Sequence, residues 1–350
     1  ATYMSDANLA AMAGIDKTIQ LRPGIEINYQ GDLTIKDTWN FAETDFSGLP
    51  KWRYGANADV AGNLVISASG KLTVANSISD AYVDGFFGPS LQKGNSWSYQ
   101  LTAGADTHSA DNFAIINTVG NNLELKGTAA NPVTIRTGNG DIKLAAGGDV
   151  VFQSQYATVY NAGRPADTNP NGSLDKYLFS DDYIVLFNAQ YAVDGGDLVI
   201  KADNNIQGAV SDQFITEWLA RVGNWGSNSP LNDPADSRIP TAWGVDVSSF
   251  RQNVGSFGGG KVNVSAGGDI NDLSVMLPST GKQVGKIDQT IDPVTGLPVT
   301  NSNGGPKFLT NEVEVAGGGQ MTVTAGGDVN GGTYMLGRGL GSISADGQIT

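Results

Sequence analysis

A thirteen-residue phrase that occurs twice constrains the fold of this chain more than any other feature. The phrase GGGKVNVSAGGDI at Gly258–Ile270 returns as GGGQMTVTAGGDV at Gly317–Val329, with every matched pair 59 residues apart. Looser copies occur at Gly140–Val150 (GDIKLAAGGDV) and at Gly196–Ile206 (GDLVIKADNNI). A chain that repeats its own wording is built from similar units that stack beside one another.

The spacing of the copies sets the size of the unit. We interpret the 59-residue interval as about three units of 20, and an offset of 39 residues between Ile25 and Leu64 as two units. The predicted unit is therefore about 20 residues. Aligned on the alanine that ends the first strand, the copies are separated by 56, 64, 59 and 20 residues, at Ala146, Ala202, Ala266, Ala325 and Ala345.

Each unit has the pattern of a strand, a corner and another strand. In the clearest copy, apolar Val262 and Val264 alternate with polar residues, which is the period of a strand with one buried face. We expect the Gly267-Gly268 pair that follows to supply a corner with positive φ angles, which bulky residues resist. One such unit cannot bury its own apolar face, so neighbouring units must stack.

The predicted fold is therefore all-β: a right-handed parallel β-helix of about 20 residues per coil, with loop and short-helix insertions. The small alanines before the corners suit a narrow interior in which equivalent positions lie above one another. The alternative is an antiparallel sandwich, which also uses short strands and glycine turns. At most about 17 coils, each roughly 4.8 Å thick, predict a shaft of about 80 Å, shorter once loops are subtracted.

The chain divides into coils and insertions. In one insertion, five apolar residues from Phe214 to Val222 share one face of a predicted helix that Ser211 caps and Gly223 ends. The whole division is a short helical lead-in at 1–16, coils at 17–155 with a loop excursion around 77–97, a loop insertion with return strands at 156–194, a coil at 195–210, a helix-containing insertion at 211–256, and coils at 257–350 with a loop at 278–307.

Composition argues against several classes of protein. The 350 residues include 47 glycines, one histidine and no cysteine, which removes disulfides and thiolate chemistry. The net charge of −14 argues against nucleic-acid binding, since phosphates need a basic surface. No stretch resembles a 20-residue apolar span, so we expect no membrane-spanning segment. The last residues lack the polar cap of a complete solenoid, and we expect a longer parent polypeptide.

Six longer phrases, taken in order, resemble the filamentous haemagglutinin family, the large exoproteins of bacterial two-partner secretion. The resemblance implies a right-handed β-helical shaft that is secreted or held at the bacterial surface after export through an outer-membrane transporter, with adhesion as its usual activity. The family's amino-terminal secretion domain has no counterpart here, so export is inferred. The phrases are LRPGIEI with GDLTI and WN (21–40), GNLVISASGKLTVANSISD (62–80), WSYQLTAGAD (97–106), IRTGNGDIKLAAGGDVVF with VYNAG (135–163), FRQNVGSFGGGKVNVSAGGDINDLSVMLP (250–278) and YMLGRGLGSISADGQI (334–349).

Five aspartates follow glycines at the predicted corners and are the candidate metal ligands. Calcium-binding β-rolls also place glycine and aspartate at corners, but their nine-residue repeat pattern does not occur here. Aspartate at a turn usually bonds its own backbone, so we expect a structural role, with structural calcium as the weaker alternative and no other cofactor. The five are Asp141, Asp149, Asp197, Asp269 and Asp328.

The sequence offers no catalytic residue. Many β-helices are polysaccharide lyases or hydrolases, and these need carboxylates set a fixed distance apart in one groove. Here the acidic residues are spread over corners and loops. With His108 the lone histidine, in the polar stretch Thr107 to Ser109, no histidine relay or histidine-rich metal site can form.

The best candidates for contact with a partner are the aromatics of the 211–256 insertion. Exposed aromatic side chains lose little entropy on binding and serve as anchors. The competing interpretation is that they bury the insertion against the shaft. The candidates are Trp218, Trp225, Trp243 and Phe250.

The leading functional hypothesis is a structural and adhesive segment of a secreted β-helical filament. Its partners would be a glycan or protein on a host or bacterial surface, or copies of itself stacked end to end. The alternative is a carbohydrate-active β-helix enzyme. A third class, the stalk of a contact-dependent toxin, needs a carboxy-terminal effector that these residues do not supply.

Overall fold

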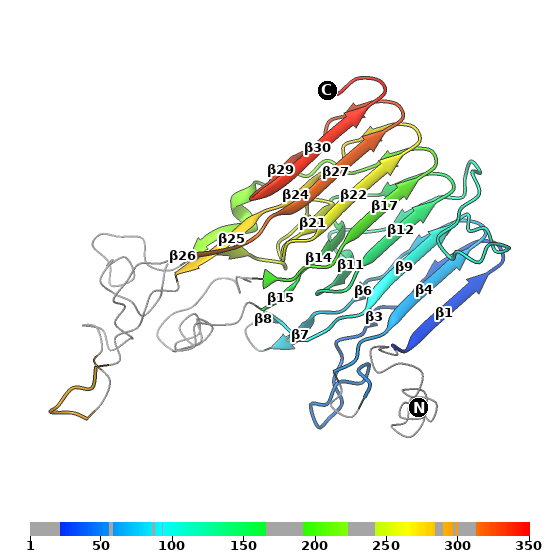
Figure 1. Cartoon of the computed structure of the whole chain (residues 1–350). Helices are drawn as coiled ribbons and strands as arrows, with labels where there is room; N and C mark the ends of the chain where they lie inside the picture. Colours follow the sequence, from blue (N-terminus) through cyan, green and yellow to red (C-terminus); the bar gives the residue numbers. More distant parts are fainter. Residues whose placement is uncertain are drawn as a thin grey trace.

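The protein is all-β, and most of its strands lie in three long parallel sheets (Figure 1). A computed structural model describes residues 22–55, 59–85, 88–92, 94–165, 192–222, 242–283, 290–296, 299 and 313–350. The helical lead-in predicted at 1–16 lies outside these residues. We name the three parallel sheets A, B and C in the order in which the chain enters them.

Sheet A has eight strands and sheets B and C have seven each. Sheet A contains β1 (Gly24–Tyr29), β4 (Asn63–Ala68), β9 (Ser98–Ala103), β12 (Ile142–Ala146), β17 (Leu198–Ala202), β22 (Lys261–Ala266), β27 (Gly319–Ala325) and β30 (Gly339–Ala345). Sheet B contains β2 (Leu33–Ile35), β5 (Leu72–Val74), β10 (Leu123–Leu125), β13 (Val150–Phe152), β18 (Ile206–Gln207), β23 (Ile270–Asn271) and β28 (Val329–Asn330). Sheet C contains β3 (Trp39–Asn40), β6 (Ile78–Ser79), β11 (Val133–Thr137), β14 (Ala157–Asn161), β21 (Val254–Ser256), β24 (Val275–Leu277) and β29 (Tyr334–Leu336).

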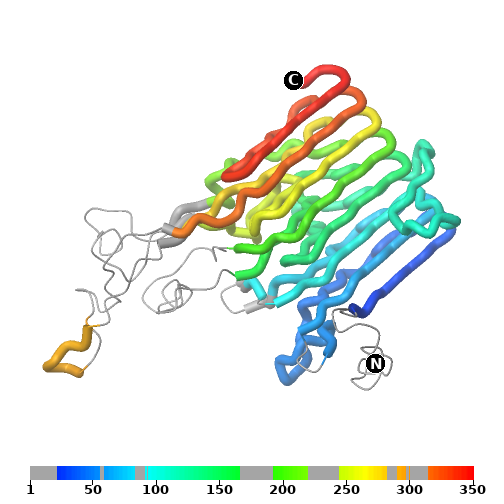
Figure 2. The backbone as a smooth tube through the Cα atoms, in the orientation of Figure 1, coloured from blue at the N-terminus to red at the C-terminus, as the bar shows by residue number. Residues whose placement is uncertain are grey.

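The chain visits the sheets in the fixed rotation A, B, C, and we call one such passage a rung. The described strands make seven complete rungs, from β1-β2-β3 to β27-β28-β29, followed by β30. Figure 2 shows the backbone winding from the blue rungs near the N-terminus to the red ones near the C-terminus. This topology is compatible with a parallel β-helix, and it excludes the antiparallel sandwich for the three main sheets.

The register confirms the sequence repeat residue by residue. In sheet A, Val262 pairs with Met321, and Ala266 pairs with Ala325, as the 59-residue offset requires. The 39-residue offset likewise pairs Ile25 with Leu64 in parallel register. Shared wording therefore marks positions that lie directly above one another.

The conversion of these offsets into numbers of coils is wrong. Each interval of 56, 64, 59 or 39 residues spans a single rung, because β12, β17, β22 and β27 are direct neighbours, as are β1 and β4. Only the 20-residue step from Ala325 to Ala345 is a rung without an insertion. The seven spacings across sheet A amount to about 34 Å, well below the predicted upper bound of about 80 Å. Long loops leave the stack at the corners, so the number of residues between equivalent positions reflects the loop length and not the number of rungs.

The core consists of columns of like residues inside the rungs. One column contains Leu64 at the second rung and Ile142, Leu198 and Val262 at later rungs, each fully buried. The alanines before the corner form another column, in which Ala68, Ala103 and Ala146 have no exposed surface. Repeating the same apolar type at 4.8 Å spacing buries a continuous interior without charged groups. This explains why small residues recur at the corner.

A buried ion pair joins two insertions near the N-terminal rungs. Arg53, in the loop after β3, donates to both carboxylate oxygens of Asp80 at 2.8 Å, and the side chains are 6% and 0% exposed. Asp80 also accepts from the backbone N–H of Trp97 at 2.7 Å, and the Trp97 indole donates to the Trp52 carbonyl. Phe41 stacks on Trp97 at 4.3 Å between ring centroids. The two loops are therefore fixed to the stack.

Two later insertions form a separate antiparallel sheet in the order β19-β20-β25-β26. It pairs β20 (Ala242–Val245) with β25 (Ser279–Gln283), and it is completed by β19 (Leu219–Val222) and β26 (Val313–Gly317). Two short antiparallel pairs, β7 (Tyr82–Gly85) with β8 (Gly88–Leu91) and β15 (Arg164–Pro165) with β16 (Ala192–Val193), lie at other insertions.

The helix predicted from Ser211 to Gly223 is wrong over its described length. A single 3-10 turn at Ile215–Glu217 is followed directly by strand β19. Apolar residues at this spacing suit a helix in isolation, but pairing of β19 with β20 satisfies the backbone through a partner about twenty residues away. The loop predicted at 278–307 likewise begins with strand β25. Within the coils predicted at 17–155, residues 114–118 contain only an isolated bridge, from Ala105 to Ile115.

Candidate functional site

The corner aspartates hold one rung to the next. At the corner between sheets A and B, Asp269 Oδ1 accepts from the backbone N–H of Asp328 at 2.8 Å, and Asp328 Oδ1 accepts from Gln348. Below them, Asp149 Oδ1 accepts from the N–H of Asn205 at 3.0 Å, and Asn205 Oδ1 accepts from Asp269 at 2.8 Å. The result is a ladder of side-chain to backbone bonds that runs along the stack.

A second ladder runs along the corner that leads into sheet A. Asp141 Oδ1 accepts from the N–H of Asp197 at 2.9 Å, and Asp197 Oδ1 accepts from the N–H of Lys261 at 3.0 Å. All five candidate aspartates thus accept hydrogen bonds from the backbone of the next rung. The sequence predicted bonds to the backbone of their own turn instead. Among the described residues, no three His, Cys, Asp or Glu side chains come together as a metal site requires.

At the corner between sheets A and B, the glycine pair before Asp149, Asp269 and Asp328 makes room for the ladder. Gly267 and Gly268 do not have positive φ angles, so the predicted conformational reason is wrong for them. A Cβ on Gly267 would meet the Asp203 carbonyl of the rung below, and one on Gly268 would meet Asn205 Oδ1. The phrase AGGD therefore encodes an interior alanine, two close backbone approaches and a carboxylate that bonds the next rung.

Two of the four aromatic contact candidates are buried. Trp218 has no exposed surface and Phe250 is 5% exposed, with their rings edge-to-face at 5.1 Å. They belong to a second apolar core that includes Tyr160 of β14 and Met276 of β24. Neither Trp218 nor Phe250 can therefore anchor a partner in this structure. Trp225 lies outside the described residues, and Trp243 is described only as part of the backbone of β20.

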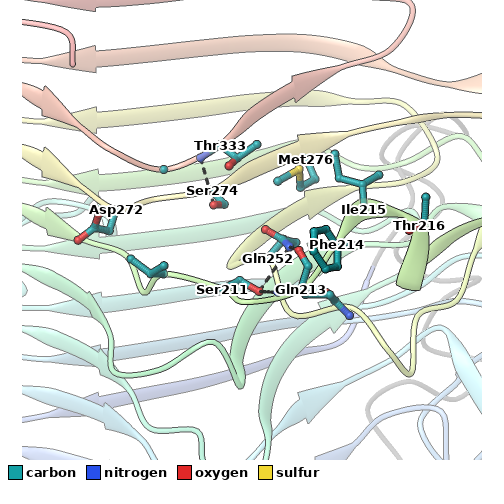
Figure 3. A pocket seen from close by; sticks show the side chains of 12 residues that line it. Ser211, Gln213, Phe214, Ile215, Thr216, Gln252, Asp272, Ser274, Met276 and Thr333 are labelled. Carbon is teal, nitrogen blue, oxygen red and sulfur yellow. Dashed lines mark hydrogen bonds between the residues drawn. The ribbon is translucent and has the colours of Figure 1, made fainter.

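A cleft opens beside these buried aromatics, on the corner between sheets B and C (Figure 3). Its volume is about 660 Å³, within the range of small-molecule sites. One wall is the segment from Val210 to Thr216, at the start of the insertion. The other lining residues come from three successive rungs and are Gln252, Asp272, Ser274, Met276, Gly332 and Thr333.

The wall of the cleft is fixed by hydrogen bonds while its apolar side chains face outward. The Gln213 amide oxygen accepts from the Arg251 N–H at 3.0 Å, its amide nitrogen donates to the Ser249 carbonyl, and Gln252 donates to the Gln213 carbonyl at 3.0 Å. Phe214 next to it is 73% exposed, although Trp218 four residues later is fully buried. Phe214 and Trp218 belong to the same predicted helix face, and of the two it is Phe214 that is exposed to solvent.

The described lining of the cleft carries a single charged side chain. Asp272 is the one ionisable side chain among the described lining residues, and it has a positive φ of 51° at its corner. No lysine or arginine is among those lining residues. Sequence reasoning missed this site because Asp272 and Phe214 lie 58 positions apart, and neither belongs to a repeated phrase.

Three of the groups with shifted pKa values in the described part of the chain are tyrosines that pack in the cores. Burial raises the pKa of Tyr334 to about 12. Burial, followed by the neighbouring Tyr160, raises the pKa of Tyr82 well above its usual value, and burial does the same for Tyr99. These shifts keep the phenols neutral and reflect their packing in the protein interior. His108 is 95% exposed in its side chain, beside Asp106, as expected for a surface histidine.

A smaller cavity of about 290 Å³ lies at the first rung, between Trp39, Trp52, Ile25 and Glu43. Trp39, Trp52 and Ile25 pack against the main core, so this cavity is a feature of the end of the stack. It offers an apolar surface with one carboxylate, and we assign it no separate role.

Comparisons of this chain with protein-family models, with curated proteins and with solved structures gave no match. The resemblance to the filamentous haemagglutinins rests on the sequence phrases alone. Among the residues that the structure describes, no helix has the length and apolar character needed to cross a bilayer.

Proposed function

We propose that this chain is a segment of a secreted bacterial exoprotein of the filamentous haemagglutinin type, in which a right-handed parallel β-helix provides a shaft and its insertions provide adhesive contacts. The observation that supports this most is the one-to-one parallel register across eight strands of sheet A. Such a ladder adds length by repetition, and it leaves the corners free to carry loops of any size.

The proposed setting is the bacterial surface or its surroundings. Export would use an outer-membrane transporter of the two-partner type, as the sequence phrases imply. A chain without cysteine suits passage through a pore in the unfolded state. The exposed outer edge of β30, where Leu340 is 74% exposed, is a template for a further rung from this polypeptide or from another copy.

The alternative is a carbohydrate-active enzyme. Glycoside hydrolases use a pair of carboxyl groups about 5 to 10 Å apart across the bond that they cleave. The described lining of the larger cleft contains one carboxylate, that of Asp272. The cleft therefore favours binding over hydrolysis.

An adhesion assay tests the proposal. Beads coated with this protein should stay attached to bacterial cells, epithelial cells or an abiotic surface under flow that removes beads coated with an unrelated acidic β-protein. Loss of the coated beads from all three surfaces would contradict the proposal. Release of new reducing ends or unsaturated sugars from polysaccharides would instead support the enzyme.

A further inference from the structure

We propose that the cleft between the Val210–Thr216 segment and the last described rungs is a binding site for an uncharged oligosaccharide. This inference rests on the adhesive function proposed above and names the class of ligand that one of its insertions would hold. The volume of about 660 Å³ admits a few sugar units, and the lining side chains come from the segment and from successive rungs (Figure 3).

The apolar rim of the cleft fits the carbon–hydrogen face of a sugar ring. Phe214 is 73% exposed, and Ile215 and Val210, which flank the same wall, are 37% and 73% exposed. These side chains are displayed by a wall that Gln213 fixes through bonds to Ser249 and Arg251. A flat aromatic face on a preorganised support gains contact area while losing little entropy.

Beside the apolar Met276, the remaining lining includes several polar side chains. Thr216, Thr333 and Asp272 bring hydroxyl and carboxylate groups to the same cleft as Phe214. The nearby backbone is already occupied, because the N–H groups of Ser274 and Thr333 bond Asn253 and Ser274 of the rungs below. An extended peptide needs free backbone partners, whereas a sugar needs side-chain groups around an apolar face, so the cleft favours a sugar.

Charge narrows the class of sugar. The one ionisable group in the described lining is the Asp272 carboxylate, and the whole chain has a net charge of −14. Acidic glycans such as uronates and sulfated chains would meet repulsion that no lysine or arginine of the described lining offsets. A neutral oligosaccharide is free of this penalty.

Isothermal titration calorimetry with defined tetrasaccharides tests the site. The full chain should bind a neutral tetrasaccharide of glucose or N-acetylglucosamine, and it should bind oligogalacturonate and a heparin-derived tetrasaccharide at least about tenfold more weakly. Phe214→Ala should weaken neutral binding by at least about tenfold. Phe46→Ala, which truncates an even more exposed ring in a loop near the first rungs, should leave binding unchanged.

A charge variant separates recognition from general stickiness. Asp272→Asn keeps a residue type that tolerates the positive φ, and it should reduce the discrimination against acidic tetrasaccharides while neutral binding persists. Failure of all neutral tetrasaccharides to bind, or wild-type binding by Phe214→Ala, would overturn the assignment. If the coated beads still adhere in that case, the adhesive function stands and only this site is wrong.

Discussion

Replacing Gly327 by alanine should destabilise the protein by crowding the ladder, and replacing Asp269 at the same time should remove most of that effect. A Cβ on Gly327 would meet Asp269 Oδ1, which is fixed by its bond to the Asp328 N–H at 2.8 Å. Asp269→Ala removes this oxygen and leaves space for the new methyl group. The two substitutions are therefore coupled through one atom.

The expected magnitudes follow from the contacts. Asp269→Ala should lower the free energy of unfolding by about 1–2 kcal/mol, because it removes a charge-assisted hydrogen bond at a part-buried corner where water can partly replace it. Gly327→Ala should lower the free energy of unfolding by about 1–3 kcal/mol, as at other overpacked sites, because the new methyl group pushes the Asp269 side chain out of place. The double variant should lose only the bond, about 1–2 kcal/mol, so the coupling energy is about 1–3 kcal/mol.

Urea unfolding of the four proteins measures this cycle through the free energy of unfolding. Gly24→Ala is the matched control, because its Cβ would make an ordinary contact of 3.9 Å and its φ is not positive. It should change stability by less than about 0.5 kcal/mol. Additive losses in the Asp269→Ala, Gly327→Ala double variant would refute the close approach on which the AGGD argument depends.

Three further perturbations test other parts of the structure. Asp80→Ala leaves Arg53 buried without its partner and should lower the free energy of unfolding by about 3–5 kcal/mol. Urea unfolding would show this as a lower midpoint, and a loss under about 1 kcal/mol would contradict a buried pair. Because Tyr334 has a folded-state pKa raised from 10.0 to about 12, the stability that it contributes is complete below about pH 10 and is lost as pH rises to 12. Tyr334→Phe should therefore flatten the fall of the urea midpoint in that window, and an unchanged slope would count against its burial. Treatment with EDTA should leave the melting temperature unchanged, since the corner carboxylates bond backbone N–H groups. A large drop in melting temperature would instead support structural calcium at these corners.

The sequence predicted the register and the core because both depend on local repetition. Val262 and Ala266 recur as Met321 and Ala325, and equal wording leads to equal position wherever neighbours stack. The corner phrase was predicted with the wrong cause, since the glycine pair provides close approach to the Asp203 carbonyl and the Asn205 side chain. Space around an atom depends on the neighbouring rung, which local sequence does not display.

The insertions were predicted less well because long-range pairing decides their structure. The segment after Phe214 has helical spacing, yet β19 pairs with β20 across an interval that no periodicity marks. The cleft was missed for the same reason: Phe214 and Asp272 approach only because an insertion returns over later rungs. Of the aromatic candidates, Trp218 proved to be core, which was the competing interpretation.

Disulfide trapping tests the stacked rungs most directly, and a chain without native cysteine makes the readout clean. Asn263 and Thr322 are outward-facing Cα partners on adjacent strands of sheet A, and Ser342 lies one strand further along. Adjacent parallel strands lie about 4.8 Å apart, within disulfide range, and two steps exceed it. Asn263→Cys with Thr322→Cys should form an intrachain disulfide on mild oxidation, and Asn263→Cys with Ser342→Cys should not. The reverse pattern, or no bond in the adjacent pair, would contradict the stack.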